Sequence, residues 1–200
     1  MVISKIVLGK LQTNCYFIEN NGEVIIIDPA NEYMKITEYI KQNHFKVKAI
    51  LVTHGHFDHV GAVHRLQKNG IPVYMSKFDS DIIEKTSGYY FLERTKSFKA
   101  DFYVKNNDEL NLIGLKIKVL ETPGHTKGSV SFLLDDFLFS GDLIFAGANY
   151  GRIDLYSGNL EDLRYSLKEV LFKLNDNITI LAGHGEQTTV KKEKDLYVDF

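Results

Sequence analysis

The chain has 200 residues, a length that fits one domain or one compact two-layered unit. Its hydrophobic content of 44% can fill a sizeable core, and its charged content of 25% is ordinary for a soluble surface. The formal net charge of −2 argues against a general nucleic-acid binder, which usually carries a basic excess. The single cysteine, Cys15, excludes an internal disulfide and lies in an apolar run, so we interpret it as a small buried hydrophobe.

The first 75 residues alternate short apolar runs with stretches of helical spacing. The apolar runs predict strands over residues 3–8, 15–19, 23–28, 49–53 and 71–75. An Asn-Gly pair, Asn21-Gly22, predicts a hairpin between the second and third of these strands. The third contains three consecutive isoleucines, Ile25 to Ile27, which favour a central strand covered on both faces. Helices are expected over residues 31–42 and 60–68.

The rest of the chain begins with a charged and aromatic stretch, residues 77–99, which we interpret as helical and as the connection between two halves of the fold. Further strands are expected over residues 115–121, 129–134, 137–140 and 178–181. An amphipathic helix is expected over residues 159–174, and a short final helix over residues 188–194. Because no linker or repeat interrupts this mixture, we expect one α/β domain over residues 1–200.

The chain shows no secretory leader and no apolar run near the 18 or so residues of a membrane span, so we expect a cytoplasmic protein that does not bind membranes. The tail, residues 191–200, mixes charges with apolar side chains. It would fold back on the body, complete a pocket or form a dimer contact, and the sequence leaves monomer and homodimer open.

The densest group of metal-binding side chains lies in the heptapeptide T-H-G-H-F-D-H, directly after the apolar strand at residues 49–52. It places His54, His56, Asp58 and His59 on one turn. Imidazole nitrogen and carboxylate oxygen suit zinc, iron or manganese. We therefore predict a metal site at this turn.

Three more candidates follow predicted strands in the same way, each beside a glycine: His125, Asp142 and His184. Glycine allows the sharp bends that bring such side chains together, and active sites favour loops on rigid scaffolds. Together the four segments use five of the seven histidines. The other two, His44 and His64, lie in helical or linker contexts and are expected to lie outside the site.

These residues resemble the metallo-β-lactamase superfamily in its glyoxalase II (hydroxyacylglutathione hydrolase) branch. The resemblance runs from about Asn14 to Val190 and is carried by six motifs: Asp28, T-H-G-H-F-D-H, T-P-G-H-T-K-G-S, S-G-D-L-I-F, G-R-I-D and G-H-G. It implies an αββα four-layer sandwich with the metal site at one edge between two sheets. The chain resembles the short form of the branch, which lacks the C-terminal helical region, so its use of glutathione is open.

The resemblance also implies two divalent metals, zinc first, with iron or manganese as alternatives. His54, His56 and His125 would hold one metal. Asp58, His59 and His184 would hold the other, and Asp142 would bridge the two. Asp28 would hold the turn in place, although its position fits the N-cap of the following helix as well.

A hydrolase follows from this set of ligands, because a metal lowers the pKa of water from 15.7 to roughly 7. Asp58 would then act as a catalytic group by orienting the attacking water and accepting its proton. The resemblance implies a small-molecule thioester substrate, such as S-lactoylglutathione, cleaved to a hydroxy acid and a free thiol. Arg152 is a candidate for a substrate anion contact or for an ion pair with Asp154, and Tyr150 for the pocket wall or the core.

Two alternatives remain. A lactonase or other ester hydrolase of the superfamily would use the same seven ligands. A persulfide dioxygenase would hold one iron and consume oxygen. A β-lactamase is disfavoured, because a cysteine usually stands where this chain has Asp142.

Overall fold

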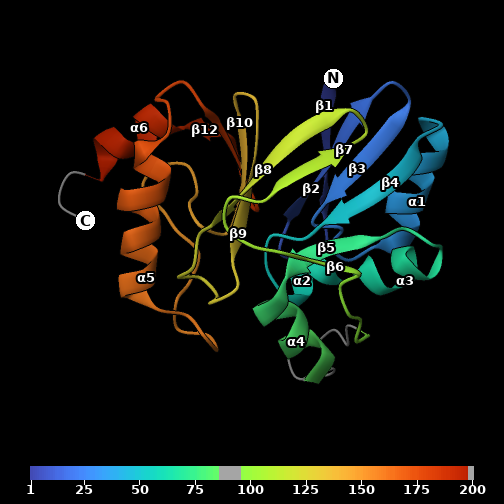
Figure 1. Ribbon diagram of the computed structural model, residues 1–200, viewed down its shortest axis with the longest axis horizontal. Helices are drawn as coiled ribbons and strands as arrows, with labels where there is room; N and C mark the ends of the chain where they lie inside the picture. Colours follow the sequence, from blue (N-terminus) through green and yellow to red (C-terminus); the bar gives the residue numbers. More distant parts are fainter. Residues whose placement is uncertain (86–95, 198–200) are drawn as a thin grey trace.

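The computed structural model describes residues 1–85 and 96–197, which form two mixed β-sheets flanked by helices (Figure 1). Within these residues each sheet has six strands. The first sheet has the order β1-β2-β3-β4-β5-β6, with β1 Val2–Leu8, β2 Thr13–Asn20, β3 Glu23–Ile27, β4 Lys46–Leu51, β5 Val73–Ser76 and β6 Phe102–Val104. The second has the order β12-β11-β10-β9-β8-β7, with β7 Glu109–Leu112, β8 Leu115–Glu121, β9 Val130–Leu134, β10 Phe137–Gly141, β11 Thr179–Ala182 and β12 Thr188–Thr189.

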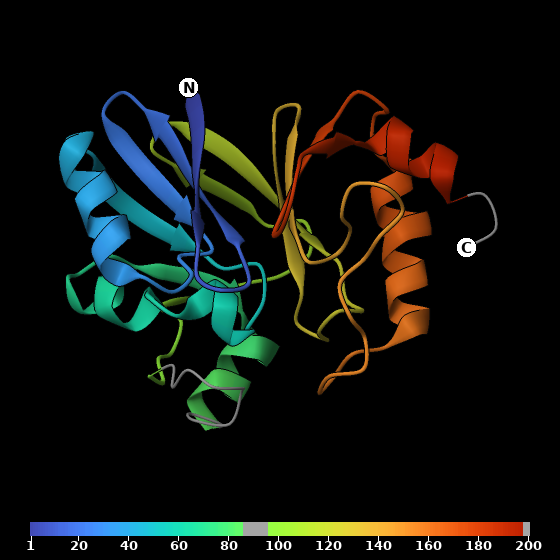
Figure 2. The ribbon, with the colours of Figure 1, turned by 180° about the vertical axis from the view of Figure 1, so that it is seen from behind.

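The helices cover the outer faces of the two sheets (Figures 1 and 2). Helices α1 (Tyr33–Gln42) and α3 (Val63–Lys68) lie outside the first sheet, and α5 (Leu160–Tyr165) and α6 (Val190–Leu196) lie outside the second. Two short helices, α2 (Phe57–Val60) and α4 (Lys77–Lys85), follow β4 and β5. The predicted αββα four-layer sandwich is therefore confirmed.

Three hydrophobic clusters correspond to the three interfaces of this sandwich. One lies between the first sheet and its helices, around Phe17 and Ile50, and another between the two sheets, around Ile25 and Phe132. The third joins the second sheet to its helices, around Leu163. Burial of apolar surface at about 25 cal/mol per Å² makes these interfaces the main stabilising contribution to the fold.

Most predicted strands are confirmed within a residue or two. The hairpin at Asn21-Gly22 joins β2 and β3, and β3 lies between β2 and β4 with Ile25, Ile26 and Ile27 almost fully buried. Cys15 is completely buried in β2, as expected of a small hydrophobe, and burial raises the pKa of its thiol.

The predicted helical connection over residues 77–99 is confirmed only in part. Residues 77–85 form α4, residues 86–95 lie outside the described residues, and residues 96–100 have no regular secondary structure. The chain then adds β6 to the first sheet, so it crosses to the second sheet only at residues 105–108. The short strands β6 and β7 escaped prediction, because β6 has only three residues and the apolar residues of β7 are interrupted by polar ones.

Two C-terminal helices also differ from their predicted form. The segment predicted as one helix over residues 159–174 begins as α5, continues through a π-helical turn, Ser166–Val170, and ends in a 3₁₀ turn, Leu171–Lys173. The final helix starts at Val190 and not at residue 188, because Thr188 and Thr189 pair with β11 first. Within the described part of the tail, residues 191–197, Tyr197 packs into the third cluster, so this part folds back on the body.

The topology gathers strand ends at one edge of the sandwich. The strands β4, β8, β10 and β11 each run toward this edge, and each is followed by one of the segments predicted to bind metal. The isolated bridge between Thr13 and His184 joins the two sheets there.

Candidate metal centre

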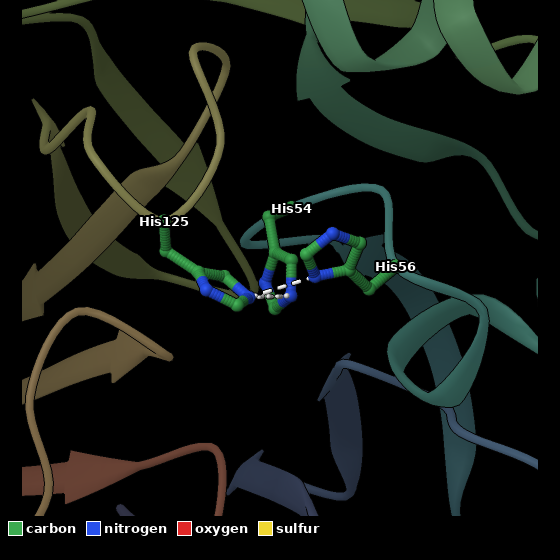
Figure 3. A group of neighbouring side chains, drawn as sticks. All are labelled: His54, His56 and His125. Carbon is green, nitrogen blue, oxygen red and sulfur yellow. Dashed lines mark hydrogen bonds between the residues drawn. The ribbon is translucent and has the colours of Figure 1, made fainter. Parts of the chain in front are cut away.

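The structure brings all seven predicted ligands together at this edge. His54 and His56 follow β4, Asp58 and His59 lie on α2, and His125, Asp142 and His184 follow β8, β10 and β11. The side chains of His54, His56 and His125 point toward one another (Figure 3). The His125 Nε2 atom lies 3.2 Å from His54 Nε2 and 2.7 Å from His56 Nδ1.

A second triad lies beside the first and consists of Asp58, His59 and His184. His59 Nε2 lies 3.3 Å from His184 Nε2, and Asp58 Oδ2 lies 3.3 Å from the same His184 atom. Asp58 Oδ2 is 3.6 Å from His59 Nε2. A tetrahedral cation with bonds of 2.0–2.1 Å separates its ligand atoms by roughly 3.3 Å, so the second triad fits a zinc-sized ion as it stands. In the first triad the 2.7 Å separation of His56 Nδ1 and His125 Nε2 would have to widen by roughly 0.6 Å.

The Asp142 carboxylate lies between the two triads. Its Oδ1 is 3.3 Å from His59 Nε2, and its Oδ2 is 3.5 Å from both His125 Nε2 and His184 Nε2. Asp142 Oδ1 is buried and accepts no hydrogen bond from the described residues. A carboxylate of this kind, aimed at imidazoles of both triads, is suited to bridge two cations.

Oxygen acceptors behind the imidazoles fix which ring nitrogen faces the centre. His125 Nδ1 donates to the Arg152 carbonyl at 2.7 Å, and His184 Nδ1 donates to the Leu11 carbonyl at 2.9 Å. Because a carbonyl oxygen can only accept, each Nδ1 carries a proton, and in the neutral ring Nε2 is the nitrogen whose lone pair can bind a metal. His56 differs, since its Nδ1 faces the centre.

Asp28 supports the turn that carries four of the ligands. Its carboxylate accepts hydrogen bonds from the Thr53 amide at 2.8 Å, the Thr53 hydroxyl at 2.6 Å and His59 Nδ1 at 2.9 Å. The alternative role as a helix N-cap is wrong, because the N-cap of α1 is Glu32 and no side chain caps that helix end. Asp28 therefore acts on the ligand loop and on the orientation of His59.

The two triads differ in charge. Burial lowers the pKa of His54, His56 and His125, with neighbouring imidazoles adding to the effect at His54 and His56. These three rings are therefore neutral at pH 7, the form that binds metal.

In the second triad, burial opposes the charged form of His59, but the carboxylates of Asp142, Asp58 and Asp28 outweigh it and raise its pKa. Burial likewise opposes charge on His184, and its bonds to Asp142 and Asp58 raise its pKa to about 9. The same ion pairs lower the pKa of both Asp58 and Asp142 against the effect of their burial. Without metal, this part of the centre holds protons.

A cavity of about 520 Å³ opens onto the centre and is lined by His56, Asp58, His125, Asp142 and His184. The remaining wall is mostly apolar and comes from Leu8, Leu11, Phe57, Phe145 and Leu155. Lys10 and Arg152 add positive charge to the lining.

The two residues predicted to bind substrate, Arg152 and Tyr150, differ in their position relative to the cavity. Arg152 lines the cavity, but its guanidinium makes a bidentate ion pair with Asp154, with both N–O distances at 2.7 Å. Tyr150 is 36% exposed, so the core role is wrong, and it is not among the residues that line this cavity, so a contact with substrate stays a prediction. His44 is exposed and His64 bonds to the Ser97 carbonyl, which keeps both outside the centre as expected.

Sequence reasoning missed several residues that hold the ligand loops. Asn14 donates from its side chain to the Ala182 and Gly185 carbonyls on either side of His184. Asp79 on α4 is buried beside the loops of His54, His56 and His125. Neither lies near a ligand in the sequence, so only a contact prediction between distant segments could have found them.

The chain belongs to the metallo-β-lactamase superfamily: residues 8–184 match the model of this family. The match includes all seven residues of the centre and the strands that carry them. Among the described residues, no helix has the length and apolar character to cross a bilayer.

Two relatives span nearly the whole chain. One is "Probable metallo-hydrolase YqgX" of Bacillus subtilis, 37% identical over 94% of this chain and 92% of its own. The other is "Hydroxyacylglutathione hydrolase GloC" of Haemophilus influenzae, 34% identical over 97% of this chain and 95% of its own.

Two solved structures share the fold closely. One is the BLEG-1 B3 metallo-beta-lactamase, with a TM-score of 0.90 and 32% identity over 97% of each chain. The other is TTHA1623 in a di-iron-bound form, with a TM-score of 0.87 and 32% identity over 98% of this chain and 100% of its own. The family, the relatives and the His/Asp triads together make this chain a metal-dependent hydrolase of the superfamily.

Proposed function

We propose that the chain is a binuclear thioester hydrolase that cleaves a substrate such as S-lactoylglutathione to a hydroxy acid and a free thiol. The observation that carries the proposal is the position of Asp142 between two His/Asp triads, with one oxygen 3.3 Å from His59 and the other 3.5 Å from His125. One triad alone would suit a single metal ion. Two triads that share the Asp142 carboxylate would suit two metal ions with a common ligand.

In this proposal His54, His56 and His125 hold the first metal, and Asp58, His59 and His184 hold the second. Asp142 binds both. The donors fit zinc, with iron and manganese as alternatives that the same atoms accept. The di-iron form of TTHA1623 supports iron as an occupant of such a centre.

When bound, the two metals would supply a water of lowered pKa and polarise the carbonyl of the substrate. Asp58 lines the cavity and would accept the proton of the attacking water as the new C–O bond forms. The C–S bond then breaks, and its electron pair leaves on sulfur as a thiolate. The apolar cavity wall would exclude bulk water from this step.

The thioester class is supported by the named activity of the Haemophilus relative and by the cavity lining. Apolar side chains would contact the acyl and thioether carbons. Lys10 would attract the carboxylates of a peptide-like thiol such as glutathione, as would Arg152 if it exchanged its bond to Asp154 for one to substrate.

A panel of substrates tests this function. The protein would be purified, its zinc, iron and manganese counted per chain, and its rates compared on S-lactoylglutathione, an aliphatic lactone and a β-lactam. Oxygen uptake would be measured with a persulfide substrate. We expect two metals per chain and the highest kcat/KM on the thioester.

A different ranking would overturn the thioester assignment. A preference for the lactone would assign a lactonase. A preference for the β-lactam would bring the activity in line with the BLEG-1 relative. One iron per chain with oxygen uptake would replace the hydrolase by a dioxygenase.

A further inference from the structure

The carboxylate of Asp79 joins two ligand loops although it belongs to neither. Asp79 lies in the first turn of α4, and a single oxygen, Oδ2, accepts two hydrogen bonds at 2.8 Å. One comes from the amide of Gly55, the residue between His54 and His56. The other comes from the hydroxyl of Thr126, which directly follows His125.

These two bonds hold the chain next to all three imidazoles of the first triad. They also connect the two sheets, because Gly55 follows β4 of the first and Thr126 follows β8 of the second. A cation–π contact strengthens the same junction: Lys127 Nζ lies 5.3 Å from the centre of the Phe78 ring, which neighbours Asp79 on α4.

The second triad is held by other groups. His59 bonds to Asp28, His184 bonds to the Leu11 carbonyl, and Asp58 accepts from Thr13 at 3.4 Å. Among the described hydrogen bonds, none runs from Asp79 to these three residues. Asp79 therefore supports the first triad alone, whereas Asp28 reaches both triads, through Thr53 next to His54 and directly at His59.

The surroundings of Asp79 are tight. Its side chain is 2% exposed, and a Cβ atom on Gly128 would collide with its Oδ1. Burial raises the pKa of its carboxyl, while the hydrogen bonds from Thr126 and Gly55 work in the opposite direction. Its other oxygen, Oδ1, is buried and accepts no hydrogen bond from the described residues. Because a buried acid with an unpaired oxygen is costly, its presence in this place indicates a role beyond packing.

We propose that Asp79 is a positioning residue that holds His54, His56 and His125 at metal-binding geometry and so sets the metal affinity of the first triad separately from the second. This inference rests on the proposed binuclear centre. A carboxylate suits the role because one charged oxygen can accept from two donors at once, and charge-assisted hydrogen bonds are roughly twice as strong as neutral ones.

The test compares Asp79→Asn with the wild-type chain. The amide keeps the size of the side chain but accepts more weakly. Each protein would be loaded with zinc and dialysed against chelators of increasing strength, and the metal retained per chain would be counted. We expect the first metal of Asp79→Asn to be lost at a free-metal concentration about 10 to 100 times higher than in the wild type, the range typical of groups that orient metal ligands. The second metal should be retained as in the wild type.

Imidazole ¹⁵N NMR of the half-loaded variant would identify the triad that lost its metal. The shifts of His54, His56 and His125 should return to their metal-free values, and those of His59 and His184 should remain metal-bound. Thr126→Val removes one of the two donors at nearly constant volume and should change metal affinity in the same direction. If Asp79→Asn does not fold, the metal affinity of Thr126→Val tests the positioning role on its own.

The matched control is Asp81→Asn on the same helix, where the carboxylate pairs with Lys77 at the surface. It should bind both metals as the wild type does. Equal loss of both metals in Asp79→Asn, or no loss from either Asp79→Asn or Thr126→Val, would overturn the positioning role. A wild-type chain that binds fewer than two metals would overturn the binuclear proposal itself.

Discussion

The Asp142 carboxylate is the residue on which both halves of the proposed centre depend. It is almost fully buried, and its two oxygens face imidazoles of different triads. Gly183, the neighbour of His184, packs so closely that a Cβ atom there would collide with Asp142 Oδ1. The position of this carboxylate is therefore fixed by backbone on the side of β11.

We predict that Asp142→Ala loses both metals and lowers kcat by at least about 1,000-fold, because each triad loses a negatively charged ligand and the pair loses its bridge. Metal counting and steady-state kinetics would check both effects. Asp136→Ala, in the exposed turn before β10, is the control and should leave both unchanged. Near-normal turnover in Asp142→Ala would show that Asp142 does not bridge.

At this scale the sequence could predict the ligands but not their supports. His54, His125 and His184 could be found because each lies just beyond an apolar strand and beside a glycine. Asp79 lies in a charged stretch, and its partners are 24 and 47 residues away in the chain. No local pattern marks such a residue, since its role arises from contacts that exist only after folding.

At the scale of elements, the C-terminal helix α6 supports a loop of the active-site cavity. Glu193 is completely buried and accepts from the amides of Gly147 and Ala148 and from the hydroxyl of Thr188. The loop that contains Gly147 continues to Arg152, whose carbonyl orients His125. The helix therefore acts on the centre through the loop and without a residue in the cavity lining.

We predict that Glu193→Ala destabilises the protein by about 1–3 kcal/mol, because the buried Thr188 hydroxyl and two part-buried backbone amides lose their acceptor. For a chain of this size the melting temperature should fall by roughly 2–10 °C. The KM should rise as the loop loosens, and thermal unfolding and kinetics would measure both. Lys192→Ala, an exposed change on the same helix, is the control. An unchanged melting temperature would contradict this role of α6.

The strand β3, a continuous apolar run, was predicted to within one residue, and the alternating strand β8 was predicted at its observed bounds. The strand β4 begins at Lys46, three residues before the predicted start, because exposed lysines interrupt the apolar run there. The half-exposed strands β6 and β7 leave a weak signal. The helix over residues 159–174 was predicted from its amphipathic pattern, but that pattern tolerates the π-helical turn at Ser166–Val170 and so cannot reveal it.

At the scale of the whole molecule, the proposed metals connect the two sheets. His54 and His56 follow a strand of the first sheet, and His125, Asp142 and His184 follow strands of the second. Each metal would therefore stabilise the sandwich as well as the site, because ligands that bind only the folded state shift the folding equilibrium.

We predict that removal of the metals with a strong chelator lowers the melting temperature by roughly 5 °C or more, and that added zinc restores it. For a free metal at 100 times its Kd, linkage gives about 2.7 kcal/mol of stabilisation per site. Calorimetry of the holoprotein, the metal-free protein and the reconstituted protein would measure the change. Equal melting temperatures would show that metal binding is not linked to folding.

The protonation of the metal-free centre predicts how its stability depends on pH. The pKa of His184 is raised from 6.5 to about 9, so its contribution is fully present below about pH 6.5 and is lost as the pH rises through 9. The pKa of His59 is raised as well, so its contribution is also lost on the alkaline side. The pKa values of His54, His56 and His125 are lowered in the folded protein. As the pH falls below 6.5, these imidazoles bind protons in the unfolded chain but not in the folded one, so the stability of the folded protein decreases.

The metal-free protein should therefore be most stable near pH 6.5 and melt at lower temperatures on both sides. Thermal unfolding between about pH 5 and pH 10, with chelator present, would trace this curve. In His184→Gln the alkaline decline should shrink, because one of the two raised imidazoles is gone, while the acid decline should persist. A melting temperature of the wild type that stays constant above pH 6.5 would contradict the charged state of His59 and His184.

Zinc binding should also release protons, because a metal must displace the protons that His59 and His184 carry at pH 7. The number of protons released into a weakly buffered solution should fall as the pH approaches 9.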